Sequence, residues 1–336
     1  MVQTIAFVTG GFSGEAEISY KSAITIEKNI DKERWDLYKI DITIDGWFYE
    51  SHSGNKIAVD KNDFSITIDD PDGYREKIVF DAVLIGIHGT PGEDGKLQGY
   101  FDTLRIPYTS CDAGTSALTF NKSFTVAVAA FSGINVSRSI LLFKNNFTPD
   151  SYRDDELVKS LRFPVFIKPN NGGSSIGMSK VNSPSEELGK AIEKAFKEDE
   201  QVLIEEFIEG REFTIGVYKA KGKIIALPIT EIISKKDFFD YEAKYEGASE
   251  EITPANIHEA IAQKIRNAAQ KAYSVFNCNG VVRIDFIYNQ KEDEPYMLEI
   301  NTVPGQSAAS LVPQQVVAMG MTLKEFYSSL IEECFI

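Results

Sequence analysis

Cysteine is scarce in this sequence. Its 336 residues include only three cysteines (Cys111, Cys278 and Cys334), and these are far apart. No Cys-x-x-Cys pair or other metal-ligand spacing occurs, which argues against a disulfide framework and against a zinc site. We therefore expect reduced and mostly packed thiols, as in cytosolic proteins.

Long apolar segments are also missing. No run approaches the length that is needed to cross a membrane. The N-terminal residues reach a glycine turn too early for a signal peptide. A hydrophobic share of 43% and a charged share of 25% are typical of a soluble globular protein. These features predict a cytoplasmic protein without a membrane partner.

The chain has no excess of basic residues. It carries 35 lysines and arginines against 50 aspartates and glutamates, which gives a formal net charge of −15. Nucleic-acid-binding proteins normally present a basic face, so nucleic acid is not expected as a partner. A phosphate ligand needs only a few lysines and remains compatible with this charge. There is also no Gly-x-Ser-x-Gly motif and no cysteine near a plausible base, so no covalent nucleophile is indicated.

The first part of the chain has the pattern of an α/β domain. Residues 4–10 form a short apolar strand, residues 15–30 have helical character, and residues 34–42 form the next predicted strand. The continuously apolar segment 81–87 predicts a strand that is covered on both faces of a parallel sheet. The turns GGFSGE and HGTPGEDG follow the first and last of these strands. Ligands on open α/β sheets bind beyond this edge.

The middle of the chain changes in character. A helix is expected over 115–131, and a strand at 163–168 leads through a glycine–serine loop into a second strand. The segment 183–199 predicts a helix, because apolar residues recur at the spacing of one buried face. Ser183 and Glu186 can form a capping box at its start.

The last third combines strands, helices and one irregular segment. Residues 230–253 are charged and have little apolar period, which is typical of a functional lid or a disordered loop. A long helix is expected to begin at Thr253 and Pro254, with His258 on its polar side. Two strands, GVVRIDFIY and PYMLEIN, should pair, and Thr322 with Glu325 should cap the last helix.

The stretch KPNNGGSSIGMSK (168–180) is the most unusual loop. Backbone N–H groups in a glycine-rich turn can converge on an anion, and Lys168 would add positive charge. The loop is not a Walker A motif, because Met178 occupies the lysine position and the loop joins two strands. Taken alone, a hairpin of this composition is more often a simple turn, so both interpretations stay open at this point.

The segments RID and LEIN suggest a second site. Side chains alternate along a strand, so Arg283 and Asp285 share one face, as do Glu299 and Asn301. If the strands pair, two carboxylates and an amide oxygen meet beside a guanidinium. Such an all-oxygen set suits Mg²⁺ that is held jointly with nucleotide phosphates. The alternative is a cross-strand salt bridge of Arg283. The other face is apolar and favours a site: Val282, Ile284, Phe286, Leu298 and Ile300.

Other polar residues carry weaker signals. Glu205 and Glu212 flank a turn and could accept hydrogen bonds from an adenine amine and a ribose, although acids in hairpins are usually just solvated. His88 stands at the end of a strand in a glycine loop, where a functional role and a structural hydrogen bond are about equally expected. His52 and His258 are expected at the surface.

Together these segments resemble the D-alanine–D-alanine ligase family of ATP-grasp enzymes, over nearly the whole chain. Six ordered motifs carry the resemblance: GGFSGEAEIS (10–19), HGTPGEDG (88–95), IKPNNGGSSIGMSKV (167–181), YEAKY (241–245), RIDF (283–286) and LEINTVPG (298–305). The resemblance implies an α/β protein of ATP-grasp architecture with a Rossmann-like N-terminal domain at 1–110. A central domain with a glycine-rich flap at 111–206 and a C-terminal domain at 207–336 would clamp ATP.

The resemblance also implies roles for individual residues of this sequence. The ATP-binding set would be Lys122, Lys168, Ser174, Ser175, Glu205, Glu206, Phe207, Ile208, Glu212 and Lys244. The metal ligands would be Asp285, Glu299 and Asn301, for two Mg²⁺ ions or, alternatively, Mn²⁺.

The implied substrate set binds two D-alanine molecules. Glu15 would receive the ammonium of the first, and the hydroxyls of Ser174 and Tyr245 would link Glu15 to the glycine loop and the lid. Arg283 and the Gly305 amide would form the oxyanion site. The contacts of the second carboxylate would be Ser310 and Leu311, with His88 nearby.

The implied activity is ATP-dependent ligation of two D-alanines through an acylphosphate, for peptidoglycan precursor synthesis, by a homodimer. Two departures from the family pattern occur. Gln306-Ser307 replaces a methionine–threonine or phenylalanine–threonine pair, and Asn121 replaces an aspartate. The nearest alternative is the same chemistry with D-lactate or D-serine as second substrate. A more distant one is a nucleotide-binding regulatory protein without turnover.

Overall fold

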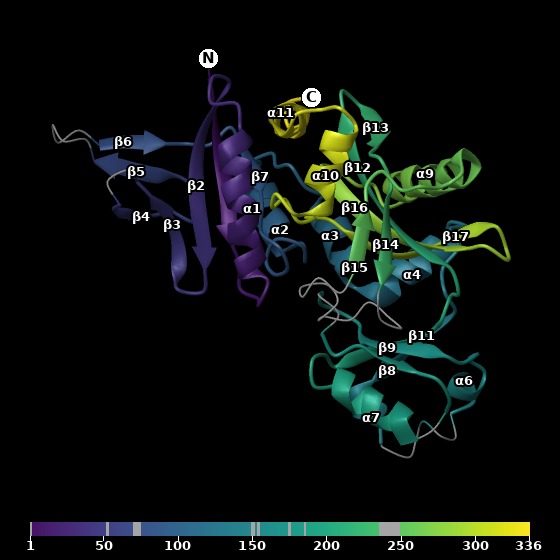
Figure 1. Cartoon of the computed structure of the whole chain (residues 1–336). Coiled ribbons are helices and arrows are strands. Elements are labelled where there is room, and N and C mark those ends of the chain that lie inside the picture. The colour runs from purple at the N-terminus through teal and green to yellow at the C-terminus, as the bar shows by residue number, and fades with distance from the viewer. Residues whose placement is uncertain are drawn as a thin grey trace.

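The structure is a computed structural model that describes residues 2–51, 54–69, 75–148, 152, 155–173, 176–184, 186–234 and 249–336. Within these ranges the chain is a mixed α/β protein, in which three larger sheets follow one another along the sequence (Figure 1). The expected α/β class is confirmed.

The first sheet is built around β1 (Gln3–Gly10). This strand pairs in parallel with β2 (Trp35–Thr43) on one side and with β7 (Ala82–Ile85) on the other. Helix α1 (Ala16–Asn29) connects β1 to β2, so the predicted βαβ unit is confirmed. All of β7 and most of β1 are buried, as expected for apolar strands inside a parallel sheet.

Several elements of this region were not predicted from the sequence. Two antiparallel strands extend the sheet beyond β2, two others form a separate hairpin, and a helix follows the turn after β7. Their bounds are β3 Gly46–Glu50, β4 Lys56–Ala58, β5 Ile66–Asp69, β6 Arg75–Ile78 and α2 Lys96–Leu104.

Two helices, α3 (Ala113–Phe120) and α4 (Lys122–Phe131), take the place of the single helix expected over 115–131. Asn121 separates them with an extended backbone (φ −92°, ψ 107°), which a helix does not tolerate in its interior. Its side-chain oxygen accepts from Phe124 N–H at 3.0 Å and caps α4. Asn121 is therefore a helix cap, a position that asparagine and aspartate fill about equally well.

The second sheet is antiparallel, with strand order β10-β9-β11-β8, and α7 covers one side of it (Figure 1). The predicted apolar face of α7 is confirmed, because Leu188, Ile192 and Ala195 are fully buried. The helix is shorter than the predicted range 183–199, since its last residues close into tighter turns. The bounds are β8 Ser139–Phe143, the 3₁₀ turn Lys144–Asn146, α6 Glu156–Lys159, β9 Val165–Pro169, β10 Ser179–Val181, α7 Glu186–Ala195 and β11 Gln201–Glu206.

The third sheet has strand order β15-β14-β12-β16-β17, with β13 beside β12. One face packs against α9 and buries the core residues Phe213, Ile284 and Phe286. The opposite face of this sheet does not contribute to this core. The bounds are β12 Arg211–Ala220, β13 Lys223–Ala226, β14 Thr230–Ser234, β15 Ser249–Ile252, α9 Glu259–Val275, β16 Val281–Asn289 and β17 Glu294–Asn301.

The predicted start of the long helix and the predicted irregular segment 230–253 were each wrong in part. Helix α9 begins at Glu259, not at Thr253 and Pro254, because Thr253 Oγ1 bonds Thr230 Oγ1 (2.6 Å) and keeps this segment beside β14. His258 is the N-cap of α9, where its Nδ1 accepts from Ala260 N–H (3.2 Å). The ends of the expected irregular segment are the paired strands β14 and β15, while residues 235–248 lie outside the described residues.

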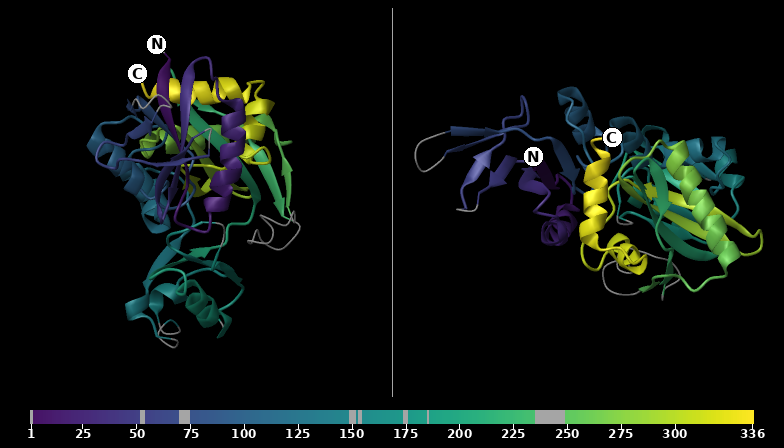
Figure 2. Two further views of the ribbon diagram at one scale, coloured as in Figure 1. Left: turned by 90° about the vertical axis from the view of Figure 1, so that its left-hand side faces the viewer. Right: turned by 90° about the horizontal axis from the view of Figure 1, so that it is seen from above.

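The last two helices return to the first sheet. Helices α10 (Leu311–Ala318) and α11 (Leu323–Glu333) share a core with β1 and α1, and α11 crosses over α1 and contacts it (Figures 1 and 2). The predicted capping box of α11 at Thr322 is confirmed. Across the described ranges, none of the helices is long and apolar enough to cross a membrane.

Candidate active site

The two turns, both predicted at the carboxyl ends of the strands of the first sheet, contact each other. Phe12 N–H donates to Thr90 O at 2.9 Å, and Glu15 stands at the start of α1. Gly89 has φ +66°, and a Cβ at this position would lie 2.5 Å from Ser13 Oγ and 2.6 Å from Glu15 Oε2. Only glycine fits this contact, so the backbone at Gly89 sets the position of the Glu15 carboxylate.

The glycine-rich loop also reaches Glu15. A Cβ on Gly173 would lie 2.7 Å from Glu15 Oε1, so the loop backbone packs against the carboxylate. The predicted link to this glutamate ran through Ser174 and Tyr245. These two residues, with Ser175 and Lys244, lie outside the described residues.

The two lysines of the predicted ATP set lie beside this loop. Lys122 Nζ donates to Gly172 O at 2.5 Å, and Lys122 N–H donates to Asn170 O at 3.0 Å. Lys168 Nζ lies 2.5 Å from Glu205 Oε2, and both side chains are largely buried. Lys168, which is expected at the phosphates, and Glu205, which is expected at the adenine, therefore form an ion pair between β9 and β11.

The residues after Glu205 have partners within the protein. The Glu206 carboxylate bonds Arg162 (2.8 Å), and its side chain is only 2% exposed. Phe207 N–H donates to Pro164 O (2.9 Å), and Lys180 Nζ lies 4.3 Å from the centre of the Phe207 ring. The remaining members of the predicted ATP set, Ile208 and Glu212, are half-buried.

The predicted pairing of RID with LEIN is confirmed. Asp285 lies directly opposite Glu299, and Arg283 lies opposite Asn301 on the neighbouring strand. Asp285 accepts from Arg283 Nε (3.0 Å) and Nη2 (2.9 Å), and Asn301 Nδ2 lies 3.4 Å from it. Thr214 of β12 donates to Asp285 at 2.5 Å from the same face. Arg283 thus forms its salt bridge within its own strand, not across to β17.

The opposite face departs from the predicted alternation at one residue. The register shifts between Asp285 and Phe286, where β17 contains an extra residue, so Phe286 pairs with Met297. Met297 is buried (2% exposed) and Leu298 only half-buried, so Met297 takes the core position expected for Leu298. The bulge leaves Glu299 and Asn301 on the face of Asp285.

The donors on this face fit a hard cation. Two carboxylates and one amide side chain project from adjacent strands, and oxygen donors are the ligands that Mg²⁺ prefers in proteins. No group of three His, Cys, Asp or Glu side chains with metal-binding geometry occurs in the described part of the chain. A cation here would therefore need further oxygen donors, such as nucleotide phosphates.

Glu93 is a site residue that sequence reasoning missed. Its carboxylate accepts from Gly89 N–H (2.7 Å) and from Val303 N–H (3.1 Å), so it joins the turn after β7 to the loop after β17. Burial, followed by the negative charge of Glu15, raises the pKa of Glu93 to about 8. The only available signal was its place inside the motif HGTPGEDG.

Arg283 is the cation of this cluster. Burial works against its charged form, but Asp285, Glu299 and Glu93 together raise the pKa of Arg283 above its ordinary range. The guanidinium therefore stays charged. Its contacts with Asp285 use Nε and Nη2.

We expect Glu93→Gln to flatten the pH dependence of stability. Between an ordinary pKa near 4.5 and a folded pKa of about 8, the folded protein holds a proton that the unfolded chain has released. Wild-type stability must therefore fall as the pH rises through this window. The variant cannot titrate, so from about pH 5 to about pH 8 its Tm should fall less, by a few degrees.

Glutamine can accept only one of the two N–H bonds, so the variant is expected to be less stable than wild type at every pH. The quantity to compare is therefore the slope of Tm against pH and not Tm itself. Glu187→Gln, on the exposed side of α7, is the control and should keep the wild-type slope. Equal slopes for all three proteins would contradict an elevated pKa at Glu93.

The loop after β17 carries the predicted oxyanion and carboxylate contacts. A Cβ on Gly305 would lie 2.8 Å from Ser310 Oγ. Ser310 Oγ accepts from Ser307 N–H (3.0 Å) and lies 2.8 Å from Ser307 Oγ. Ser310 is the N-cap of α10 but makes no side-chain capping bond, so the first amides of this helix, beginning at Leu311, lack that partner.

His88 lies behind this loop and is 5% exposed. Its Nδ1 lies 2.7 Å from Val303 O, and its Nε2 lies 2.9 Å from Ser22 Oγ. Ser22 Oγ also accepts from Gln306 N–H at 3.0 Å. Burial lowers the pKa of His88 to about 4, against the bond to Val303, so the ring is neutral near pH 7.

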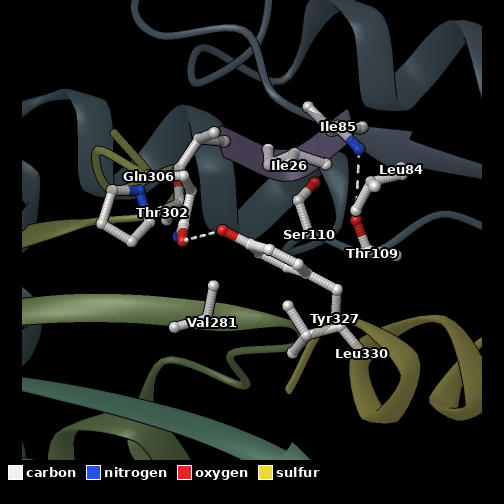
Figure 3. A pocket seen from close by; sticks show the side chains of 12 residues that line it. Ile26, Leu84, Ile85, Thr109, Ser110, Val281, Thr302, Gln306, Tyr327 and Leu330 are labelled. Atoms are coloured by element: carbon white, nitrogen blue, oxygen red, sulfur yellow. Dashed lines mark hydrogen bonds between the residues drawn. The ribbon is translucent and has the colours of Figure 1, made fainter. Parts of the chain in front are cut away.

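The Gln306 side chain lies between the first sheet and the C-terminal helices. Tyr327 donates its hydroxyl to Gln306 Oε1 at 3.3 Å (Figure 3). Both residues line a cavity of about 20 Å³ together with Ile26, Leu84 and Leu330. This volume suffices for about one water molecule. Gln306, which replaces the methionine or phenylalanine of the family pattern, therefore contributes to the packing of the first sheet against the C-terminal helices.

Comparisons with known proteins agree with this geometry. A family model described as D-ala D-ala ligase N-terminus matches residues 4–111, and one described as D-ala D-ala ligase C-terminus matches residues 128–332. A D-alanine–D-alanine ligase from Flavobacterium johnsoniae is 44% identical over 331 residues, which cover 98% of this chain and 99% of the relative. One from Phocaeicola vulgatus is 44% identical and covers both chains completely.

This chain belongs to the D-alanine–D-alanine ligase family. Its predicted family membership is thereby confirmed, and so is the ATP-grasp fold that the family shares.

Solved structures of the family superpose on most of this chain. The VanG D-Ala:D-Ser ligase from Enterococcus faecalis gives a TM-score of 0.87 at 30% identity, covering 99% of this chain and all of that one. The D-alanine–D-alanine ligase from Bacillus anthracis complexed with ATP gives 0.75 at 27% identity, covering 99% and 97%.

Proposed function

We propose that this chain joins two D-alanine molecules into D-alanyl-D-alanine, with ATP as the energy source, for peptidoglycan precursor synthesis. One observation carries the proposal within the family. The turn after β7 packs against Glu15 at Gly89, and its residues Glu93 and His88 bond it to Val303 in the loop that holds Gly305, beside Arg283. The proposed ammonium-binding acid and the two proposed oxyanion donors thus belong to segments that meet around Glu93.

In the first step, a carboxylate oxygen of the first D-alanine attacks the γ-phosphorus of ATP. The bond from this phosphorus to the β,γ-bridging oxygen breaks, and ADP leaves with that electron pair. Both reactants are anions, so Lys122, Lys168 and the glycine-loop amides must offset their repulsion. Glu15 would hold the ammonium group and Arg283 the carboxylate.

In the second step, the neutral amine of the second D-alanine attacks the acyl carbon of D-alanyl phosphate. A C–N bond forms, the C–O bond to the phosphoryl group breaks, and inorganic phosphate leaves while the nitrogen loses its extra proton. Negative charge develops on the carbonyl oxygen, where Arg283 and the Gly305 amide can stabilise it. The uncapped start of α10, with Ser310 and Leu311, suits the second carboxylate.

We also propose that Asp285, Glu299 and Asn301 hold two Mg²⁺ ions, or Mn²⁺ instead. A divalent cation bound there supplies positive charge to the β- and γ-phosphates during transfer. The residues offer oxygen donors from one sheet face, as such a cation requires.

Three further features belong to this proposal. The domain boundaries are 1–110, 111–206 and 207–336, consistent with the ranges of the three sheets. Ser174, Ser175, Lys244 and Tyr245 complete the site as the motifs imply. The protein works as a cytoplasmic homodimer on small-molecule substrates, without nucleic-acid or membrane partners.

A D-alanine–D-serine ligase is the second candidate. It is favoured by the similarity to the solved D-Ala:D-Ser ligase from Enterococcus faecalis. The two functions differ only in the acceptor. Incubation with ATP, D-alanine and, separately, D-serine or D-lactate, followed by mass analysis of the products, distinguishes them. The absence of ADP and dipeptide with D-alanine alone would contradict the main proposal.

Glu15→Gln is expected to raise the KM for D-alanine about tenfold, because a charged hydrogen bond to the ammonium group becomes a neutral one. The KM for ATP should change little, since the proposed role of Glu15 is to hold the ammonium group of D-alanine and not the nucleotide. Steady-state ADP release at varied D-alanine and varied ATP measures both constants. An equal rise of both would contradict the assigned role of Glu15.

A further inference from the structure

We propose that Ser22 and His88 are positioning residues that hold the Gly305 amide in place for the second step of the reaction. The inference rests on the proposed function. It goes beyond it by giving His88 an indirect role in place of a polar contact with substrate, and by assigning a role to Ser22.

The loop from Thr302 to Gln306 is fastened to the first domain on both sides of Gly305. On one side, Val303 bonds Glu93 through its N–H (3.1 Å) and His88 Nδ1 through its carbonyl (2.7 Å). On the other side, Gln306 N–H donates to Ser22 Oγ (3.0 Å). Pro304 has no N–H, so the Gly305 amide is the one donor between the two anchors.

One assignment of protons satisfies every group in this chain of bonds. A carbonyl oxygen only accepts, so the Nδ1 of His88 must carry the proton that is given to Val303. In the neutral ring Nε2 is then an acceptor, and the Ser22 hydroxyl donates to it. The Ser22 oxygen is left to accept from Gln306 N–H. Both ring nitrogens of His88 are thus committed within the protein.

Burial makes these bonds costly to replace. Ser22 is fully buried, and His88 and Gln306 are 5% and 6% exposed. Water therefore has little access to compensate a lost partner, and the loop must shift when one is removed. A displaced Gly305 amide loses its alignment with the oxyanion, which exists only in the second step. Formation of the acylphosphate needs this amide less.

The expected kinetic effect is that ADP release becomes uncoupled from dipeptide formation. An acylphosphate that waits longer for the amine has more time to be hydrolysed by water. Ser22→Ala is expected to lower the rate of dipeptide formation about tenfold, and to raise the ratio of ADP to dipeptide well above one, with the KM for ATP within about twofold of wild type. A purely structural role would lower the amount of active protein but leave this ratio at one.

Four variants complete the test. Ser22→Cys keeps the volume with a weaker hydrogen-bonding group, and should uncouple even if Ser22→Ala folds poorly. His88→Asn retains an N–H near the position of Nδ1 and should be less impaired than His88→Ala. Ser328→Ala is the matched control, because Ser328 is buried and accepts one bond from Trp35 Nε1 (3.2 Å) without touching the loop.

Two results would overturn the inference. The first is a one-to-one ratio of ADP to dipeptide in Ser22→Ala and Ser22→Cys. The second is equal impairment of His88→Asn and His88→Ala, which would indicate that the imidazole itself meets the substrate. Failure of the proposed function has a different outcome, because the wild-type protein would then form no dipeptide from D-alanine at all.

Discussion

Arg283→Ala is expected to lower the rate of D-alanyl-D-alanine formation by about 1000-fold, and Arg283→Lys by about 100-fold. Arg283 is the charged donor of the predicted oxyanion site, and Asp285 holds it in a fixed orientation through Nε and Nη2. Alanine removes both the donor and the charge. Lysine keeps the charge near Asp285 but lacks the planar fork that two parallel bonds require.

The matched control for this prediction is Arg211→Ala. Arg211 lies on β12 of the same sheet and makes an equally bidentate pair with Glu231, at 2.7 Å for both bonds. It shares a face with Phe213 and the α9 core, opposite to the face of Asp285. This variant should lose stability but keep its kcat. Rates of dipeptide formation by mass analysis decide the matter, and similar losses for Arg283→Ala and Arg211→Ala would contradict the oxyanion role.

The metal face was the most predictable part of the site. The period of two along a strand places Arg283 with Asp285, and Glu299 with Asn301, whatever the surrounding fold. The apolar residues between them determine which face is buried. The register that sets Asp285 opposite Glu299 then follows from burying those residues together. Local pattern and tertiary packing agree here, so the sequence was sufficient to predict which residues share this face.

The features that escaped prediction depend on contacts between distant segments. The bulge that buries Met297 in place of Leu298 is a local irregularity with no separate sequence signal. Helix α9 begins late because Thr253 bonds Thr230, a residue far back in the chain. Glu93 matters because Val303, 210 residues away, donates to it. Periodicity describes one segment at a time and cannot reveal such partners.

Gly89→Ala should be about as damaging as Arg283→Lys, although Gly89 has no side chain. Alanine at φ +66° costs about 1 kcal/mol in backbone strain. Its Cβ would also lie within 2.6 Å of both Ser13 Oγ and Glu15 Oε2, so the carboxylate must move. The Gly89 N–H that donates to Glu93 would move as well. A displacement of this size predicts a loss of about 100-fold in kcat/KM for D-alanine, with ATP binding largely kept.

Gly99→Ala separates this effect from a general cost of replacing glycine. Gly99 lies in α2, just beyond the same turn, and a Cβ there would meet only Ala113 Cβ at an ordinary 3.8 Å. Alanine favours a helix, so this variant should keep full activity and gain slightly in Tm. If Gly89 acts partly through Glu15, the double variant Gly89→Ala/Glu15→Gln must lose less than the product of the two single losses. Full additivity would mean that the Gly89 backbone affects catalysis without moving the carboxylate.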